Sequence, residues 1–313
     1  MELADMSRRP HSEARPFRPC NLCGGWNVSL YIRLRSNGLE ALRCRDCDMV
    51  YIGNNPLSDE ELPKLYTMEA FEGRRHFQSQ EWYVDYYVDC LKGYSLTSPV
   101  VRQFVSILET ISRHGGGKRL LDIGCATGVL LDLARHAGFE TMGTEVSQEL
   151  AEYARSNFNL EVRVGELFEH GFPDAAFDVV TMLDVIEHIP LYDRLLPEIR
   201  RVLKPGGLFV CRTPIEEAFL RTIAKLLYAL SWRRWDLPLL WFYSFDHVNS
   251  FSKRTLTCLL DTYGFRVVEM RSQSETPARL NVPGMIRAGL VVAETIAGMF
   301  DRRHKVLAIA RRT

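Results

Sequence analysis

The chain has 313 residues, 46% of them hydrophobic, and its 39 Lys and Arg residues balance 39 Asp and Glu residues. This length and hydrophobic content allow a full α/β core together with a second small module. A net charge of zero gives no overall attraction to nucleic acid or to an anionic membrane, and therefore argues against both as partners. A local basic patch containing Arg233 and Arg234 remains compatible with this balance.

The N-terminal segment has no hydrophobic core of the kind that targets a chain for secretion. Residues 1–19 are predicted to be a disordered or processed tail. Nowhere does an apolar run approach the roughly 18 residues needed to span a bilayer. We therefore expect a cytoplasmic protein, in which clustered cysteines indicate metal binding rather than disulfides because cytosolic thiols stay reduced.

Four cysteines form two pairs separated by twenty residues: Cys20, Cys23, Cys44 and Cys47. This spacing matches a tetrahedral Zn²⁺ site with four thiolate ligands. Segments 28–34 and 39–42 are predicted to be short strands joined by an Asn-Gly turn. Residues 20–52 are thus predicted to be a zinc ribbon. Four cysteines leave no open coordination position, so the metal is expected to be structural. Clamping of a substrate or partner is the alternative role.

Residues 53–114 are predicted to be a linker with entrance helices. Segment 81–94 is rich in Trp and Tyr, a pattern that is typical of a packed helix but also of a lid over a small-molecule site. Segment 100–111 is predicted to be an amphipathic helix that leads to three glycines at 115–117.

The stretch 119–131, RLLDIGCATGVLL, combines an apolar strand, a turn from Gly124 to Gly128 and the start of a helix. This is the opening unit of a doubly wound α/β fold, in which ligands bind at the carboxyl ends of the strands. Ala126 stands where the dinucleotide fingerprint G-x-G-x-x-G has its middle glycine, which disfavours an NAD-dependent oxidoreductase.

Alternating strand and helix patterns continue to the end of the chain. Further strands are predicted at 139–146, 160–165, 177–182, 208–213, 265–270 and 306–311, and helices at 148–157, 195–203 and 283–300. Glu145 ends the first of these strands about 20 residues beyond the glycine turn, where a ribose-binding carboxylate belongs in such folds. The alternative is an exposed glutamate at a strand end.

The motif LLDIGCATG resembles motif I of the class I S-adenosylmethionine (SAM)-dependent methyltransferases. The resemblance continues through Glu145, FDVVTMLDVIEHI (177–189) and LKPGG (203–207). It implies a Rossmann-like seven-stranded methyltransferase sheet over 115–313, doubly wound and with the last strand antiparallel. It also implies SAM as the methyl donor.

The same resemblance implies which residues bind SAM. They are Asp122, Gly124, Cys125, Ala126, Gly128, Glu145, Val146, Glu166, Leu167 and Leu183. In this alignment Glu166 and Leu167 lie at the adenine edge, Leu183 borders the methionine part, and Asp122 braces the glycine turn or the cofactor's ammonium group.

A polar cluster follows the strand at 177–182. Asp184, Glu187 and His188 have the i, i+3, i+4 spacing of one helix face. The segment is similar to that of ubiquinone-pathway O-methyltransferases, some of which are metal-assisted, and His188 is a candidate catalytic residue. The alternative is a helix N-terminus with favourable acids and a hydrogen-bonded buried histidine.

The insertion 214–252 is predicted to be a substrate lid made of a helix at 215–230 and an aromatic loop. The loop carries Trp232, Trp235, Trp241, Phe242, Tyr243 and Phe245. Its DHVNSFS segment is similar to a stretch near the acceptor site of ribbon-bearing methyltransferases. His247 is therefore the leading candidate for a general base, with a structural histidine as the alternative.

We therefore expect transfer of a methyl group from SAM to O, N or C of a small-molecule acceptor. The ribbon-first layout resembles enzymes of secondary-metabolite, sugar or polysaccharide biosynthesis. An RNA methyltransferase with a zinc ribbon and a catalytically inactive SAM-binding module are the alternatives. The oligomeric state is left open, with a homodimer as one option.

Overall fold

The computed structural model describes residues 18–55, 94–190, 192–274 and 284–313, without the side chain of Ile286. Its larger unit is a seven-stranded sheet in the order β10-β11-β8-β7-β4-β5-β6. The strands are β4 (Arg119–Ile123), β5 (Glu140–Glu145), β6 (Val162–Val164), β7 (Phe177–Leu183), β8 (Leu203–Pro214), β10 (Phe265–Gln273) and β11 (Lys305–Arg312). Strands β8, β7, β4, β5 and β6 run parallel, whereas β11 is antiparallel to β8 and β10. The predicted methyltransferase sheet is confirmed.

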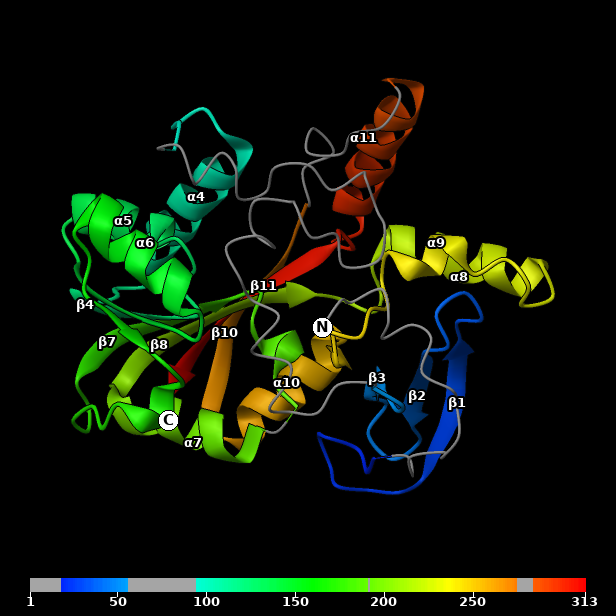
Figure 1. Cartoon of the computed structure of the whole chain (residues 1–313), viewed down its shortest axis with the longest axis horizontal. Coiled ribbons are helices and arrows are strands. Elements are labelled where there is room, and N and C mark those ends of the chain that lie inside the picture. The colour runs from blue at the N-terminus through cyan, green and yellow to red at the C-terminus, as the bar shows by residue number, and fades with distance from the viewer. Residues whose placement is uncertain (1–17, 56–93, 191, 275–283) are drawn as a thin grey trace.

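Helices cover both faces of this sheet (Figure 1). On one face lie α4 (Pro99–Arg113), α5 (Val129–His136) and α6 (Gln148–Phe158), and on the other lie α7 (Tyr192–Val202) and α10 (Lys253–Thr262). Each presents apolar residues at helical spacing to one of two buried clusters, one on each side of the sheet. The predicted entrance helices between residues 56 and 93 lie outside the described residues.

Two boundaries differ from the sequence prediction. The helix predicted at 195–203 runs from Tyr192 to Val202, and the strand predicted at 208–213 begins already at Leu203, as β8. The helix predicted from Ile215 begins only at Phe219, as α8 (Phe219–Leu230). Ile215 instead forms a β-bridge with Phe251, which holds the backbone extended beyond the end of β8.

The N-terminal cysteine module forms a second, four-stranded sheet. Three of its strands come from the module, β1 (Val28–Arg33), β2 (Glu40–Cys44) and β3 (Val50–Ile52), and the fourth is β9 (Asn249–Ser250). Strand β9 pairs with β3 in the register Val50↔Ser250 and Tyr51↔Asn249. The two strands predicted in this module are confirmed, and a segment 200 residues further along the chain completes the sheet.

The aromatic loop packs chiefly against the ribbon. The role of the insertion as a substrate lid stays a prediction. Four of the six aromatic residues, Trp241, Phe242, Tyr243 and Phe245, join a third apolar cluster with β1–β3 and α8. Only Trp232 and Trp235 are exposed. A small ribbon cannot bury its own apolar face, so aromatic side chains of the larger unit cover that face.

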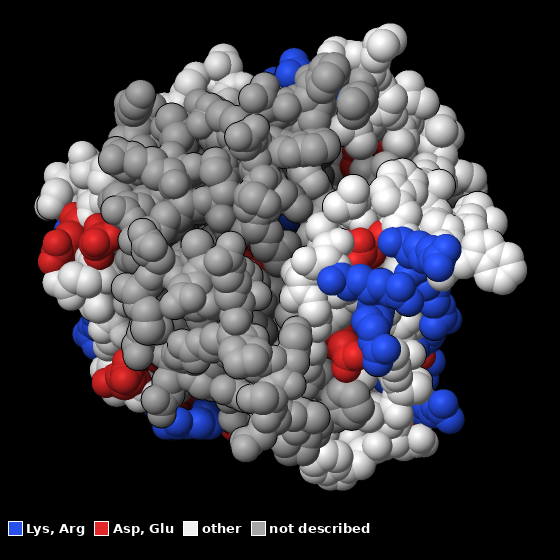
Figure 2. Space-filling view, turned by 45° about the vertical axis from the view of Figure 1, so that its right-hand side comes forward, with Lys and Arg blue, Asp and Glu red and all other residues white. Residues whose placement is uncertain are grey.

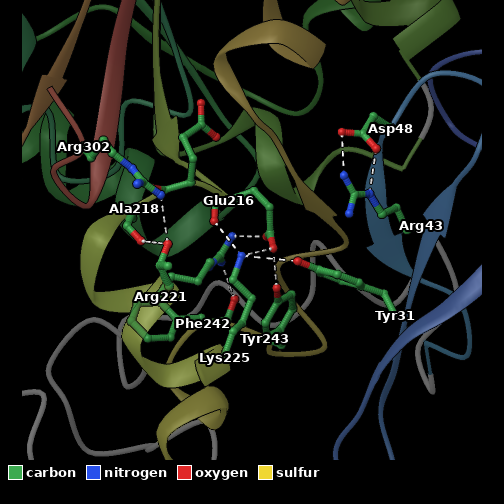
Figure 3. A network of polar contacts seen from close by, with 12 residues as sticks. Tyr31, Arg43, Asp48, Glu216, Ala218, Arg221, Lys225, Phe242, Tyr243 and Arg302 are labelled. Carbon is green, nitrogen blue, oxygen red and sulfur yellow. Dashed lines mark hydrogen bonds and ion pairs between the residues drawn. The ribbon is translucent and has the colours of Figure 1, made fainter. Parts of the chain in front are cut away.

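A buried polar network crosses the same interface (Figure 3). The Glu216 carboxylate accepts hydrogen bonds from Arg221 Nη1 at 2.7 Å, Lys225 Nζ at 2.9 Å and Tyr243 Oη at 2.7 Å. Lys225 also lies 3.3 Å from the hydroxyl of Tyr31 on β1. Removing one partner of such a buried network is costly because the others lose their compensation. The contact between Lys225 and Tyr31 connects this network to the ribbon.

Basic side chains gather on one part of the visible surface despite the zero net charge (Figure 2). Figure 2 shows Lys and Arg gathered on the side of the molecule that carries the ribbon, with a few acidic groups among them. Arg233 and Arg234, singled out in the sequence, are both exposed. Among the described residues, no helix is long and apolar enough to cross a membrane.

Candidate active site

The turn between β4 and α5 brings its backbone close to neighbouring elements. Gly124, Ala126 and Gly128 all adopt positive φ angles, of 69°, 49° and 83°. A Cβ on Gly124 would lie 2.6 Å from Val185 Cγ2, and one on Gly128 would lie 2.6 Å from Leu160 Cδ1. Side chains at these two positions would therefore clash as well as strain the backbone, which explains why glycine occupies both.

Glu145 at the end of β5 contacts this turn directly. One carboxylate oxygen accepts a hydrogen bond from Ala126 N at 2.8 Å, and the other accepts one from Ser147 N at 2.9 Å. Burial raises the pKa of Glu145, and the backbone N–H groups oppose this effect. Each oxygen has a second lone pair, so the carboxylate can also accept hydrogen bonds from a ligand's two adjacent hydroxyls.

Asp122, two residues before the turn, and Cys125, within it, are both buried. Asp122 accepts a 2.6 Å hydrogen bond from Thr181 Oγ1, and burial raises the pKa of Asp122 to about 7. Burial also raises the pKa of Cys125 well above its usual value, so the thiol is a neutral packing group. A cationic ligand group nearby would favour the ionised form of Asp122.

The remaining predicted cofactor residues lie at the ends of the neighbouring strands. Val146, just after β5, is 37% exposed, and Leu183 is half-buried at the end of β7. Glu166 forms a reciprocal cap with Glu169 on the short helix η2 (Leu167–Glu169). The side chain of Leu167 is buried in the core.

Asp184 does not share a helix face with Glu187 and His188, which corrects the sequence prediction. It sits at φ 59° in the turn after β7, before the short 3₁₀ helix η3 (Ile186–His188). Its carboxylate binds Arg212 Nη2 at 2.5 Å and Lys305 Nζ at 3.1 Å. Burial would raise the pKa of Asp184, but these two cations lower it well below its usual range.

Sequence reasoning missed the roles of Arg212 and Lys305. The available signal was Arg212 itself, a cation inside the otherwise apolar strand LFVCRT, because buried arginines are almost always paired. Its carboxylate partner could not be identified from spacing.

The structure brings Glu187 together with both histidine candidates, His188 and His247. One potential ligand atom from each of the three residues lies within 4.8 Å of the others. The two imidazole rings make an edge contact with centroids 4.7 Å apart. His188 Nδ1 donates a 2.7 Å hydrogen bond to the carbonyl of Asp246, since a carbonyl oxygen can only accept.

Burial shapes the protonation of this cluster. It raises the pKa of Glu187 to about 7, an effect that His188 partly opposes. Burial, opposed by the carboxylate of Asp246, lowers the pKa of His247 to about 4. At neutral pH His247 is therefore a neutral imidazole with a lone pair that can accept a proton or bind a metal ion.

The four paired cysteines also converge, at one end of the ribbon. Cys20 and Cys47 have their sulfurs 3.4 Å apart, those of Cys23 and Cys44 are 3.6 Å apart, and all four lie within 4.8 Å of one another. A tetrahedron with Zn–S bonds of about 2.3 Å has sulfur–sulfur edges of about 3.8 Å. The cluster therefore has the donor set and the spacing that fit a zinc ion.

The doubly wound sheet, the glycine turn and the contacting strand-end carboxylate define a class of α/β proteins that bind a ribose-containing cofactor at the carboxyl edge. Residues 100–270 match the family described as "Methyltransferase domain". The chain belongs to this family of SAM-dependent methyltransferases.

Relatives agree with this assignment. The protein named "Probable S-adenosylmethionine-dependent methyltransferase" of Mycolicibacterium smegmatis is 30% identical over 167 residues, which cover 53% of this chain and 59% of that protein. A ubiquinone biosynthesis O-methyltransferase of Methylococcus capsulatus is 27% identical over 124 residues, covering 37% of this chain and 50% of that protein. This chain thus spans about half the length of these curated relatives.

A solved structure shares the fold. The geranyl diphosphate C-methyltransferase of Streptomyces coelicolor A3(2) aligns with a TM-score of 0.50 and 16% identity over 82% of this chain and 97% of that one. At this identity the likeness concerns the fold alone.

Proposed function

We propose that the chain transfers a methyl group from SAM to O, N or C of a small-molecule acceptor held beside Glu187, His188 and His247. The observation that carries this proposal is the 2.8 Å hydrogen bond between Ala126 N and Glu145. It joins the glycine turn and the strand-end carboxylate into one surface, the arrangement that binds ribose-containing cofactors in doubly wound folds.

The histidine cluster adjoins this surface. Val185 is the residue whose side chain approaches Gly124, and η3 begins at the next residue. An acceptor beside the cluster would therefore face the methionine end of a ligand that lies over the turn. In this arrangement Leu183 borders that end, Asp122 faces the ammonium group, and Val146, Glu166 and the backbone of Leu167 border the adenine.

The main contribution of the protein to this reaction is to align the methyl donor with the acceptor. SAM supplies a methyl group on a sulfonium, which is already an excellent leaving group. The residues around it hold the two reactants in line and exclude water. His247, neutral at pH 7, takes the acceptor's proton or orients its nucleophile.

We further propose that Cys20, Cys23, Cys44 and Cys47 hold a structural Zn²⁺. Four thiolates complete the tetrahedral coordination of the ion, so the site stabilises the ribbon and takes no part in the chemistry. A place in secondary-metabolite, sugar or polysaccharide biosynthesis follows from the ribbon-first layout.

The proposal is tested by incubating the full chain with methyl-labelled SAM and a small-molecule extract from the source cells. We expect S-adenosylhomocysteine to form, and label to enter one low-molecular-weight product whose identification gives the acceptor. SAM binding without label transfer to any small molecule would instead support an inactive SAM-binding module. Transfer of label to RNA, measured in parallel, would support the RNA methyltransferase.

A further inference from the structure

A buried carboxylate faces two imidazoles beside the proposed cofactor surface. Glu187 is 2% exposed, and its Oε2 atom has no hydrogen-bond partner among the described residues. Leaving a buried carboxylate oxygen unsatisfied is costly, and such atoms are rare in folded proteins. Glu187 forms a group with His188 and His247 in which one carboxylate oxygen and one nitrogen of each ring lie within 4.8 Å of one another.

The two histidines are held in place from different directions. The hydrogen bond from His188 Nδ1 to the carbonyl of Asp246 puts the ring proton on Nδ1, so the ring's lone pair is on Nε2. Metal-binding histidines are commonly oriented in this way, by a backbone carbonyl on the ring nitrogen that does not bind the metal. His247 is fixed by its position two residues before β9, whose Asn249 donates a 2.7 Å hydrogen bond to the carbonyl of Ile189.

The donor set indicates the kind of ion. Two imidazoles and one carboxylate are the protein ligands of many catalytic zinc sites and of non-haem iron sites. Three protein ligands leave coordination positions open for water or a substrate, unlike the four-cysteine cluster. Asp184, grouped with Glu187 and His188 in the sequence, is unsuited as a ligand because Arg212 and Lys305 neutralise it.

We propose that Glu187, His188 and His247 bind one divalent transition-metal ion, and that this ion takes an oxygen of the methyl acceptor as a further ligand. The inference rests on the proposed methyl transfer and specifies it as O-methylation of a hydroxyl compound. The acceptor's O–H bond breaks and its proton passes to water. The oxygen's electron pair then forms the bond to the methyl carbon, while the C–S bond breaks and its electron pair stays on sulfur.

The metal would act by lowering the pKa of the hydroxyl that it binds. A bound Zn²⁺ lowers the pKa of water from about 15.7 to about 7, so a similar effect would generate an alkoxide or phenolate at neutral pH. In this site His247 serves as a metal ligand. Loss of its side chain would therefore remove both the metal ion and the imidazole that faces the acceptor.

The first experiment measures the ion itself. The full chain, with zinc in the cysteine site, is titrated with Co²⁺ and followed by visible absorption and by metal analysis. We expect one further Co²⁺ per chain, with weak d–d bands and without the thiolate-to-cobalt charge-transfer bands of a cysteine site. Glu187→Gln and His247→Ala should each weaken this binding at least tenfold. His114→Ala, which removes a histidine that contacts Glu269 elsewhere in the fold, should leave it unchanged.

The outcomes separate this inference from the proposed function. Absence of a second cobalt site, or equal binding by Glu187→Gln, would overturn the metal site. So would full methyl transfer after a chelator removes the second ion while zinc analysis shows the cysteine site still filled. In each of these cases methyl transfer itself would stand. Failure of the protein to bind SAM, measured on the same preparation, would instead overturn the proposed function.

Discussion

Replacing Cys44 with serine is expected to release zinc and to reduce turnover roughly 100-fold, the size of loss that an approximately 1 Å misplacement of reacting groups can cause. Cys44 is fully buried at the end of β2, with its sulfur 3.6 Å from that of Cys23. Structural zinc contributes about 10–16 kcal/mol to folding in isolated zinc-finger peptides. A ribbon that loses one zinc ligand is therefore expected to lose most of the free energy that stabilises its fold.

The effect on turnover follows from the way the ribbon holds the segment that carries His247. Besides the β3–β9 pairing, Ile52 N donates to the carbonyl of Val248 at 3.0 Å, and Asn21 Nδ2 donates to Asn249 Oδ1 at 2.8 Å. When the ribbon unfolds after losing its zinc, the backbone on the C-terminal side of His247 loses these hydrogen bonds. The glycine turn and Glu145 belong to the larger sheet, so SAM affinity should change little.

Zinc content, SAM affinity and turnover are measured on the same preparations. Cys258→Ser, which alters an exposed cysteine on α10, is the matched control and should behave as wild type. If Cys44→Ser lost its zinc and kept normal turnover, the ribbon would not position the acceptor site.

The second large effect is expected from His247→Ala. Loss of a positioned proton acceptor or metal ligand should lower turnover about 10²–10⁴-fold. SAM affinity should stay close to wild type, because the contacts of Glu145 and of the glycine turn do not involve the segment of His247.

Steady-state turnover and SAM calorimetry check this prediction. The control is His136→Ala, which removes an exposed histidine at the end of α5. Normal turnover in His247→Ala would remove this residue from the chemistry. An equal loss of SAM affinity would show that the residue acts through the cofactor surface instead.

The parts of the molecule that depend on short spacings could be predicted from the sequence. The glycine turn follows from the pattern strand, glycine and helix, and the position of Glu145 follows from the length of one βαβ unit. The contact between Glu145 and Ala126 agrees with that expectation. The convergence of the four cysteines follows in the same way from their paired spacing.

Features that depend on distant segments could not be predicted. The i, i+3, i+4 spacing placed Asp184 with Glu187, but a left-handed turn at Asp184 directs it towards Arg212 and Lys305. The spacing contained no sign that His247 would replace it in the cluster. Tertiary packing decided both outcomes, since each contact joins residues more than 25 positions apart in the sequence.

The aromatic loop shows a second limit of sequence reasoning. Composition shows that so many aromatic side chains need a partner surface, but it does not distinguish a ligand pocket from a neighbouring module. The apolar side of the ribbon, formed by residues such as Ile32 and Val50, turned out to be that surface for most of them.

Calorimetry of SAM binding to the zinc-loaded chain tests the central claim most directly, with Glu145→Ala and Glu140→Ala in parallel. Glu140 begins the strand that Glu145 ends and is exposed, so it provides a matched control. We predict one SAM bound per wild-type chain and per Glu140→Ala chain. A charged hydrogen-bonding group contributes about 1.5–3 kcal/mol, so Glu145→Ala should bind SAM roughly 10- to 100-fold more weakly. No heat of binding with the wild-type chain, or equal affinity in Glu145→Ala, would contradict the account.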